Sequence, residues 1–313
     1  MCGSARGLIG IGWQRHPVEE PVIQPRHVLI AGATATGKSA LAMQRAAEIG
    51  GVIVNADSQQ LYADLRILTA RPSVEDEAAL PHCLYGVADA SEAWSAGRWL
   101  NAVESLLKAE TRPLVIVGGT GLYFHALLKG LAPVPAISPD VRDRIDAAFE
   151  SHGETEVRKA LAQVDPLAER RITPGDRQRL VRALSVSEST GRSLSSWQAE
   201  TTPPLLNLDM CEAWVVERPR EALYARCDAR VDAMIAAGAI AEVESLLARR
   251  LRPDLPAMLA VGVREIAAAV AGEMDLETAV QTLKTHTRQY AKRQLTWFRN
   301  QMPDWTRRNL AEL

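Results

Sequence analysis

The sequence has few aromatic residues, few cysteines and almost no net charge. Aromatic side chains make up 5% of the 313 residues, so aliphatic side chains must fill most of the core. The net charge of −2 gives no sign of a protein that is basic overall, so any nucleic-acid-binding surface must be local. The four cysteines form no Cys-x-x-Cys pair, which argues against a zinc site or a redox motif and is typical of reduced thiols: Cys2, Cys83, Cys211 and Cys227.

Long apolar runs are also missing. No stretch approaches the ~18 uninterrupted apolar residues that a membrane-spanning helix needs. The N-terminal residues carry a short Gly-rich apolar run without a small-residue cleavage site, which makes a poor secretory signal. We therefore expect a cytoplasmic protein without membrane contact, in which residues 1–25 form a flexible tail ending in a proline-rich linker.

Apolar, β-branched runs alternate with helical patterns in the first part of the chain. The runs cover residues 27–32, 51–57 and 114–119. Such alternation predicts βαβ units and a doubly wound parallel α/β sheet. A further strand is predicted at 211–217, and from residue 220 onward the pattern is helical to the end.

The pattern changes between the third and fourth runs. A proline-rich break leads into residues 139–200, where charged and apolar side chains alternate at helical spacing and no strand signal occurs. We therefore divide the chain into the tail, an α/β core at 26–130, a helical insertion at 131–207, and a return to the core with C-terminal helices at 208–313.

A phosphate-binding loop follows the first run. It fits the pattern G-x-x-x-x-G-K-[ST] between a strand and a helix, and its residues are Gly32, Ala33, Thr34, Ala35, Thr36, Gly37, Lys38 and Ser39. The glycines let backbone N–H groups surround phosphate oxygens, Lys38 adds a positive charge, and the Ser39 hydroxyl is placed to bind Mg²⁺. The loop predicts a P-loop NTPase-like (nucleotide-kinase-like) α/β fold, but it does not choose between phosphate chemistries.

The ends of two predicted strands narrow the choice between phosphate chemistries. Asp57 closes the second run, and the carboxyl ends of neighbouring parallel strands share one crevice, so Asp57 can serve as a base for an incoming nucleophile. The alternative is that Asp57 only caps the next turn. The third run ends in Gly118-Gly119-Thr120-Gly121, without the metal-linked acid of a hydrolytic P-loop enzyme. This favours group transfer over a motor or a GTPase.

Several longer motifs occur in a recognisable order. They are GATATGKS at 32–39, DSQQLY at 57–62, LTARPS at 68–73, GGTGLY at 118–123, DRQRLVRALSV at 176–186, LYARCDARVDAMIAAG at 223–238 and TRQYAKRQLTWFR at 287–299. From about residue 27 to residue 300 the chain resembles the tRNA dimethylallyltransferases, also called tRNA isopentenyltransferases. It departs from them at Val263, where a tyrosine is usual, and this departure concerns either one tRNA contact or its packing.

The resemblance implies a reaction. A dimethylallyl group would pass from dimethylallyl diphosphate to the exocyclic amine of the adenosine 3′-adjacent to the tRNA anticodon, with Mg²⁺ as cofactor and diphosphate as leaving group. Asp57 would orient and deprotonate the amine, Thr120 would hold the reacting region, and Arg230 would grip the diphosphate. The family also suggests a monomer without a protein partner.

The resemblance also implies a set of contacts with the tRNA anticodon stem-loop. The expected residues are Asp57, Ser58, Gln59, Gln60, Thr120, Arg142, Gln178, Arg179, Leu180, Val181 and Arg182. A second basic region is expected on the last long helix, where Lys284, Arg288 and Lys292 share one face.

Three other functions stay open at this point. The protein could be a P-loop kinase of nucleosides or metabolites, an isopentenyltransferase acting on free adenine nucleotides, or an RNA-binding protein with a vestigial phosphate loop. The intact Lys38 and Asp57 argue against the last. The basic C-terminal region and the helical insertion argue against the first two, because a small acceptor needs no long basic surface.

Overall fold

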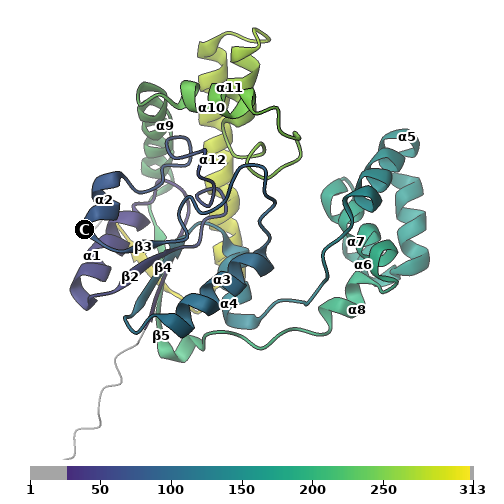
Figure 1. Cartoon of the computed structure of the whole chain (residues 1–313), viewed down its shortest axis with the longest axis horizontal. Coiled ribbons are helices and arrows are strands. Elements are labelled where there is room, and N and C mark those ends of the chain that lie inside the picture. Colours follow the sequence, from purple (N-terminus) through teal and green to yellow (C-terminus); the bar gives the residue numbers. More distant parts are fainter. Residues whose placement is uncertain (1–26, 311–313) are drawn as a thin grey trace, which may run out of the picture.

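A six-stranded parallel sheet forms the centre of the protein (Figure 1). The computed structural model describes residues 27–310, so the expected tail at 1–25 lies outside the described part. The order is β3-β2-β4-β1-β5-β6, and the strands are β1 (His27–Gly32), β2 (Val52–Asn55), β3 (His82–Cys83), β4 (Leu114–Gly118), β5 (Cys211–Glu217) and β6 (Thr306–Asn309). The predicted α/β fold class, with its P-loop NTPase-like core, is confirmed.

Helices cover both faces of the sheet, which explains why the central strands are apolar throughout. Alternate side chains of β1 enter different cores: Val28 and Ile30 pack with α1, whereas Leu29 and Ala31 belong to the larger core of the opposite face. The helices of the first part are α1 (Lys38–Ile49), α2 (Val74–Ala79), α3 (Ala96–Ala109) and α4 (Gly121–Lys129).

Two close contacts fix β2 against its surroundings at the carboxyl edge of the sheet. The indole Nε1 of Trp99, on α3, donates to the carbonyl of Asn55 over 2.7 Å, and its ring stacks on Tyr123. Gly118 lies so close to β2 that a Cβ there would overlap the backbone of Ala56. The ends of β2 and β4 are therefore held together, with no room for a side chain between them.

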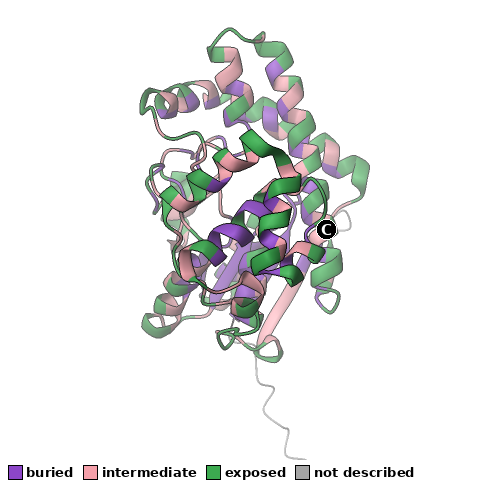
Figure 2. Cartoon of the chain, turned by 90° about the vertical axis from the view of Figure 1, so that its right-hand side faces the viewer, coloured by how far each residue is buried: buried purple, intermediate pink, exposed green. Residues whose placement is uncertain are grey.

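The insertion has a core of its own and stands to one side of the sheet (Figures 1 and 2). Its helices are α5 (Pro139–Val164), α6 (Pro166–Arg171), α7 (Arg177–Thr190) and α8 (Leu194–Gln198). Two extended segments connect it to the sheet, and they pair with each other where Leu131 and Thr202 exchange hydrogen bonds. Arg252, beyond α10, forms a second link through Asp143 of α5 at 2.9 Å. The domain boundaries given above stay a prediction.

The C-terminal part differs from the sequence prediction in one element. Its helices are α9 (Arg220–Ala236), α10 (Ala239–Ala248), α11 (Val263–Val270) and α12 (Leu276–Gln301), with a short 3₁₀ turn η1 (Leu208–Met210) before β5. The chain was expected to stay helical to its end, but β6 pairs with β5 as an edge strand. The β6 sequence, TRRN, has no apolar alternation, so only main-chain pairing reveals it. No helix of the described residues is long and apolar enough to span a membrane.

The contact between Gly118 and Ala56 yields a prediction about stability. We expect Gly118→Ala to lower the free energy of unfolding by about 1–3 kcal/mol, because the new methyl group must push β2 away from β4. Gly97→Ala is the matched control, since a Cβ at that helical position meets no atom closer than 3.7 Å. Thermal unfolding of both variants checks this, and equal melting temperatures would contradict it.

Candidate active site

The phosphate loop connects β1 to α1 in an open, anion-binding conformation. Ala35 and Gly37 both have positive φ angles, 62° and 98°, and no side chain caps the first turn of α1. Within the described part of the chain, the backbone N–H groups of Ala35 and Gly37 donate to no other protein atom. Alternating left-handed residues ahead of a helix N-terminus form a concave nest of N–H groups, so the loop is suited to a phosphate group.

Two arginines hold this loop from its outer side. Arg218 Nε donates to the carbonyl of Thr36 at 2.8 Å, and Arg226 Nε donates to the carbonyl of Ala35 at 2.9 Å. Because C=O and N–H point in opposite directions in a trans peptide, holding the Thr36 carbonyl turns the next N–H group, that of Gly37, towards the opposite side. The arginines therefore help to orient the nest.

Lys38 is buried beneath the loop. Its Nζ donates to the carbonyl of Ala33 at 3.3 Å, and 8% of the residue is exposed. Burial lowers the pKa of the Lys38 ammonium to about 8; the charge of Asp57 opposes this shift, and the charge of Arg230 adds to it. An anion bound in the nest would therefore stabilise the charged form of Lys38.

Asp57 lies just beyond β2 and is 9% exposed. Its Oδ1 accepts from the N–H of Gln59 at 3.1 Å, and its own N–H donates to Asn55 Oδ1 at 2.7 Å. The turn-capping role considered above is therefore present, but it occupies only Oδ1. Oδ2 has no hydrogen-bond or ion-pair partner in the described residues, so it remains able to accept a proton.

Thr120 connects the end of β4 to the segment that carries Asp57. Its N–H donates to the carbonyl of Ala56 at 3.1 Å, and its Oγ1 accepts from the N–H of Ser58 at 2.9 Å. The same hydroxyl lies 3.2 Å from Ser58 Oγ. Thr120 therefore fixes the backbone on both sides of Asp57.

Arg230 and Asp57 line a small cavity of about 30 Å³. Its Nη2 donates to the carbonyl of Thr69 at 3.0 Å, and burial lowers the pKa of its guanidinium while Asp57 opposes that shift. The polar wall of the cavity is Thr34, Asp57, Gln59, Thr69, Arg230, Thr287 and Tyr290, and the apolar wall is Leu68, Met234, Val261 and Leu283. A carboxylate, a guanidinium and apolar side chains therefore border one crevice next to the phosphate loop.

Comparison with known proteins identifies the family. The family described as IPP transferase matches residues 60–301, and the family described as Isopentenyl transferase matches residues 25–83. The chain belongs to the IPP transferase family. The tRNA dimethylallyltransferase of Phenylobacterium zucineum is 53% identical over 91% of this chain and 93% of its own length, and that of Caulobacter sp. is 51% identical over 90% and 91%. The predicted family and enzyme class are confirmed.

Solved structures of this family have the same fold. The tRNA isopentenylpyrophosphate transferase of Bacillus halodurans is 31% identical, covers 92% of this chain and 90% of its own, and superposes with a TM-score of 0.63. A eukaryotic dimethylallyltransferase acting on tRNA is 26% identical and covers 90% of this chain and 73% of its own, with a TM-score of 0.74.

The residues expected to contact tRNA fall into two groups in the insertion. Gln178 and Arg179 are exposed on α7, whereas Leu180 and Val181 are buried in the core of the insertion. The side chains of these two therefore support α7 and leave the surface to their neighbours. Arg182 lines a groove of about 1250 Å³ between the insertion and the edge formed by α3 and α4.

Arg142 lies at the start of α5, close to Arg182. Partial burial and the Arg142 charge lower the pKa of the Arg182 guanidinium. Arg142 is half-exposed and lies 3.7 Å from Asp146 and also 3.7 Å from Asp254, so part of its charge is already balanced.

The expected basic face of α12 is not open. Lys284 pairs with Asp232 at 2.7 Å and Arg288 pairs with Asp228, both on α9, so these charges are neutralised. The acids lie fifty to sixty positions earlier in the sequence, which is why the α12 pattern alone did not reveal them. Of the three cations, only Lys292 lacks an acidic partner in the described part.

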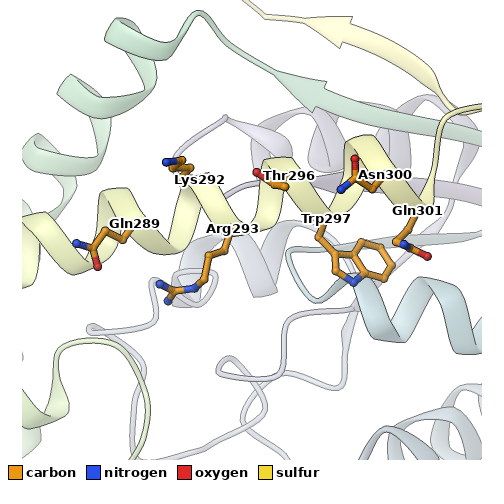
Figure 3. A pocket seen from close by; sticks show the side chains of 7 residues that line it. All are labelled: Gln289, Lys292, Arg293, Thr296, Trp297, Asn300 and Gln301. Atoms are coloured by element: carbon orange, nitrogen blue, oxygen red, sulfur yellow. The ribbon is translucent and has the colours of Figure 1, made fainter. Parts of the chain in front are cut away.

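A neighbouring face of α12 is open instead. A pocket of about 590 Å³ runs along it. Figure 3 shows the side chains that line this pocket: Gln289, Lys292, Arg293, Thr296, Trp297, Asn300 and Gln301. Trp297 also packs on Gly121, while Phe298 is 1% exposed and lies in the core. Val263, where the resemblance led us to expect a tyrosine, is likewise 1% exposed and packs in the main core.

The lowered pKa of Lys38 yields a prediction about pH. Above pH 8 the side chain of Lys38 in the free protein loses its proton. Binding of diphosphate must then be accompanied by uptake of a proton at Lys38. We therefore expect the affinity for inorganic diphosphate to fall roughly tenfold between pH 8 and 9.5. In Lys38→Arg the guanidinium stays protonated, so any decline should reflect only the ionisation of the ligand. Calorimetric titration of both proteins checks this, and parallel pH curves would refute it.

Proposed function

We propose that this protein transfers a dimethylallyl group from dimethylallyl diphosphate to the exocyclic amine of the adenosine 3′-adjacent to the tRNA anticodon, releasing diphosphate. The observation that carries the proposal is the crevice itself. Thr34 of the phosphate loop and Asp57, which has one free carboxylate oxygen, line one cavity whose other wall is apolar. That arrangement suits an apolar group that leaves a diphosphate, and β4 ends in glycines where a hydrolytic enzyme has an acid.

The donor occupies both parts of the crevice in this proposal. Its diphosphate lies in the nest, against Lys38 and Arg230, and its five-carbon chain lies against Leu68, Met234 and Leu283. As the allylic C–O bond breaks, the bonding electrons move to the bridging oxygen. The nest and the two cations stabilise the growing negative charge, and stabilisation of that charge accelerates the reaction.

A divalent metal, which we take to be Mg²⁺, would be held by the Ser39 hydroxyl at the start of α1 and would supply positive charge to the diphosphate. Mg²⁺ usually takes one or two protein oxygens together with substrate phosphates and water. The exposed Ser39 hydroxyl fits such a site, and the described residues contain no cluster of three metal-binding side chains that would suit a dedicated cage. When bound, the metal neutralises diphosphate charge.

The acceptor adenine approaches Asp57 from the other side. The lone pair of its exocyclic nitrogen forms the new N–C bond to the allylic carbon, and Asp57 Oδ2 takes the proton that the nitrogen must lose. Thr120 and Ser58 hold Asp57 in place through the hydrogen bonds described above. In the same proposal, Gln59 and Gln60, which follow Asp57 at this edge of the sheet, contact the tRNA.

The RNA lies between the core and the insertion. An adenine in a single-stranded loop leaves its stack at a cost of only a few kcal/mol, which allows it to reach the buried carboxylate. Arg179 and Arg182, with Gln178 and Arg142, supply phosphate and base contacts from the insertion side. In the same proposal the enzyme acts in the cytoplasm, where tRNA is available, as the monomer that the resemblance suggests and with no further protein partner.

One assay separates this function from its rivals. We expect label from dimethylallyl diphosphate to appear on unmodified tRNA in the presence of Mg²⁺, and not on AMP or ATP. The insertion and its groove support this outcome, because a free nucleotide would leave them unused. Label on AMP alone would replace the proposal with a free-nucleotide isopentenyltransferase.

The role of Asp57 is tested by a neutral isostere. We expect Asp57→Asn to lower kcat by about 10²–10⁴-fold, because an amide cannot take the amine proton, while tRNA affinity stays within about threefold. Asp209→Asn, at an exposed position on η1, serves as the control and should behave as wild type. An equal loss of transfer and tRNA binding would show that Asp57 is structural.

We expect the basic residues of the insertion and those of α12 to contribute differently to tRNA binding. We expect Arg182→Gln to raise the KM for tRNA roughly tenfold and to reduce the salt slope by about one, leaving the donor KM unchanged. Lys284→Gln should change neither, because Asp232 already neutralises that charge. Steady-state kinetics at three salt concentrations checks both, and a larger effect at position 284 would contradict the assignment.

A further inference from the structure

Gln294 joins three segments that are far apart in the sequence. It lies on α12, is 6% exposed, and its Oε1 accepts from the N–H of Thr34 in the phosphate loop at 2.9 Å. Its Nε2 donates to the carbonyl of Gly119, in the turn after β4, also at 2.9 Å. One buried amide therefore connects the loop that follows β1 with the turn that follows β4.

The two partners fix which way the amide points. The Thr34 N–H can only donate and the Gly119 carbonyl can only accept, so neither partner tolerates the flipped amide. A carboxylate at this position would keep the acceptor and lose the donor, and an apolar side chain would lose both. The bridge thus requires an amide of this length.

Gln294 also lies beside the carboxylate of Asp57. A Cβ on Gly119 would overlap Gln294 Nε2 and would stand only 3.2 Å from Asp57 Oδ2, so both groups border the same small space. Glycine is needed at position 119 because amide and carboxylate approach so closely there. The oxygen nearest this point is the one that the turn hydrogen bond leaves free.

The open pocket of α12 lies on a helix face next to Gln294. Arg293 and Trp297 precede and follow Gln294 within one turn and line the open pocket of α12 (Figure 3). Trp297 packs on Gly121, two residues after the turn that Gln294 holds. Gln294 and Trp297 therefore attach the same stretch of α12 to the phosphate loop and to the segment after β4.

We propose that Gln294 is a positioning residue: it holds the phosphate loop and the turn that contains Asp57 in the relative positions that transfer requires. It directs the Thr34 N–H away from the nest and leaves the later N–H groups of the loop for the diphosphate. The proposal rests on the proposed function for its kinetic consequences, but its effect on the nest is independent of the acceptor.

Gln294→Met tests the bridge, and Gln281→Met, at an exposed position on the same helix, is the matched control. We expect Gln294→Met to raise the Kd for inorganic diphosphate with Mg²⁺ and the KM for dimethylallyl diphosphate about tenfold, with the tRNA KM within twofold of wild type. The control should match wild type in all three. A variant that binds diphosphate normally, whatever its melting temperature, would overturn the proposal.

Gln294→Glu supplies a second readout, which also serves if Gln294→Met does not fold. A carboxylate beside Asp57 makes it harder for both groups to ionise, so we expect the acidic limb of the kcat–pH profile to move up by about one pH unit. An unmoved limb would show that position 294 does not lie beside the carboxylate that takes the amine proton, and would count against the proposal.

The two hypotheses fail separately. If wild type labels AMP and not tRNA, the proposed acceptor is wrong, yet the diphosphate titrations still test the bridge. If wild type labels tRNA and Gln294→Met binds diphosphate with unchanged Kd, the bridge is wrong and the function stands.

Discussion

The close approach of β2 and β4 at the carboxyl edge of the sheet is the constraint on which the site depends. Gly118 lets the backbone of β4 contact Ala56, and the Thr120 N–H then binds the carbonyl of that residue. Asp57 follows directly, so its carboxylate is carried to the crevice that the phosphate loop enters from β1 on the other side of β4. Parallel strands make this possible because their carboxyl ends share one edge, where loops can converge on a ligand.

The crevice concentrates charge at a cost to stability. Lys38 is buried and Arg230 is partly buried, and burial lowers the pKa of each, which means that the folded protein holds their charged forms less favourably than water does. Asp57 offsets part of this cost from the same cavity. A diphosphate would offset more, so these residues are arranged for binding an anion rather than for stability, as is common at functional sites.

The C-terminal helix contributes more to the site than its charges suggest. One face packs on α9 through ion pairs, another lines an open pocket, and between them Gln294 reaches the phosphate loop. Helical spacing places Lys284 and Arg288 on one face correctly, but it does not say what covers that face. The insertion shows the same limit, because Leu180 and Val181 lie within a basic motif and yet point into its core.

The sequence by itself determined the α/β class, the phosphate loop, Asp57 and the family, because each of these depends on contiguous residues and local periodicity. It did not reveal β6, whose polar residues are placed by main-chain pairing with β5 alone. The tertiary structure alone decided which cations are neutralised, that Val263 is a packing residue, and that Gln294 bridges Thr34 and Gly119 over separations of 260 and 175 positions. Such contacts join segments whose separate patterns are ordinary, and only the folded chain brings their atoms within hydrogen-bonding distance.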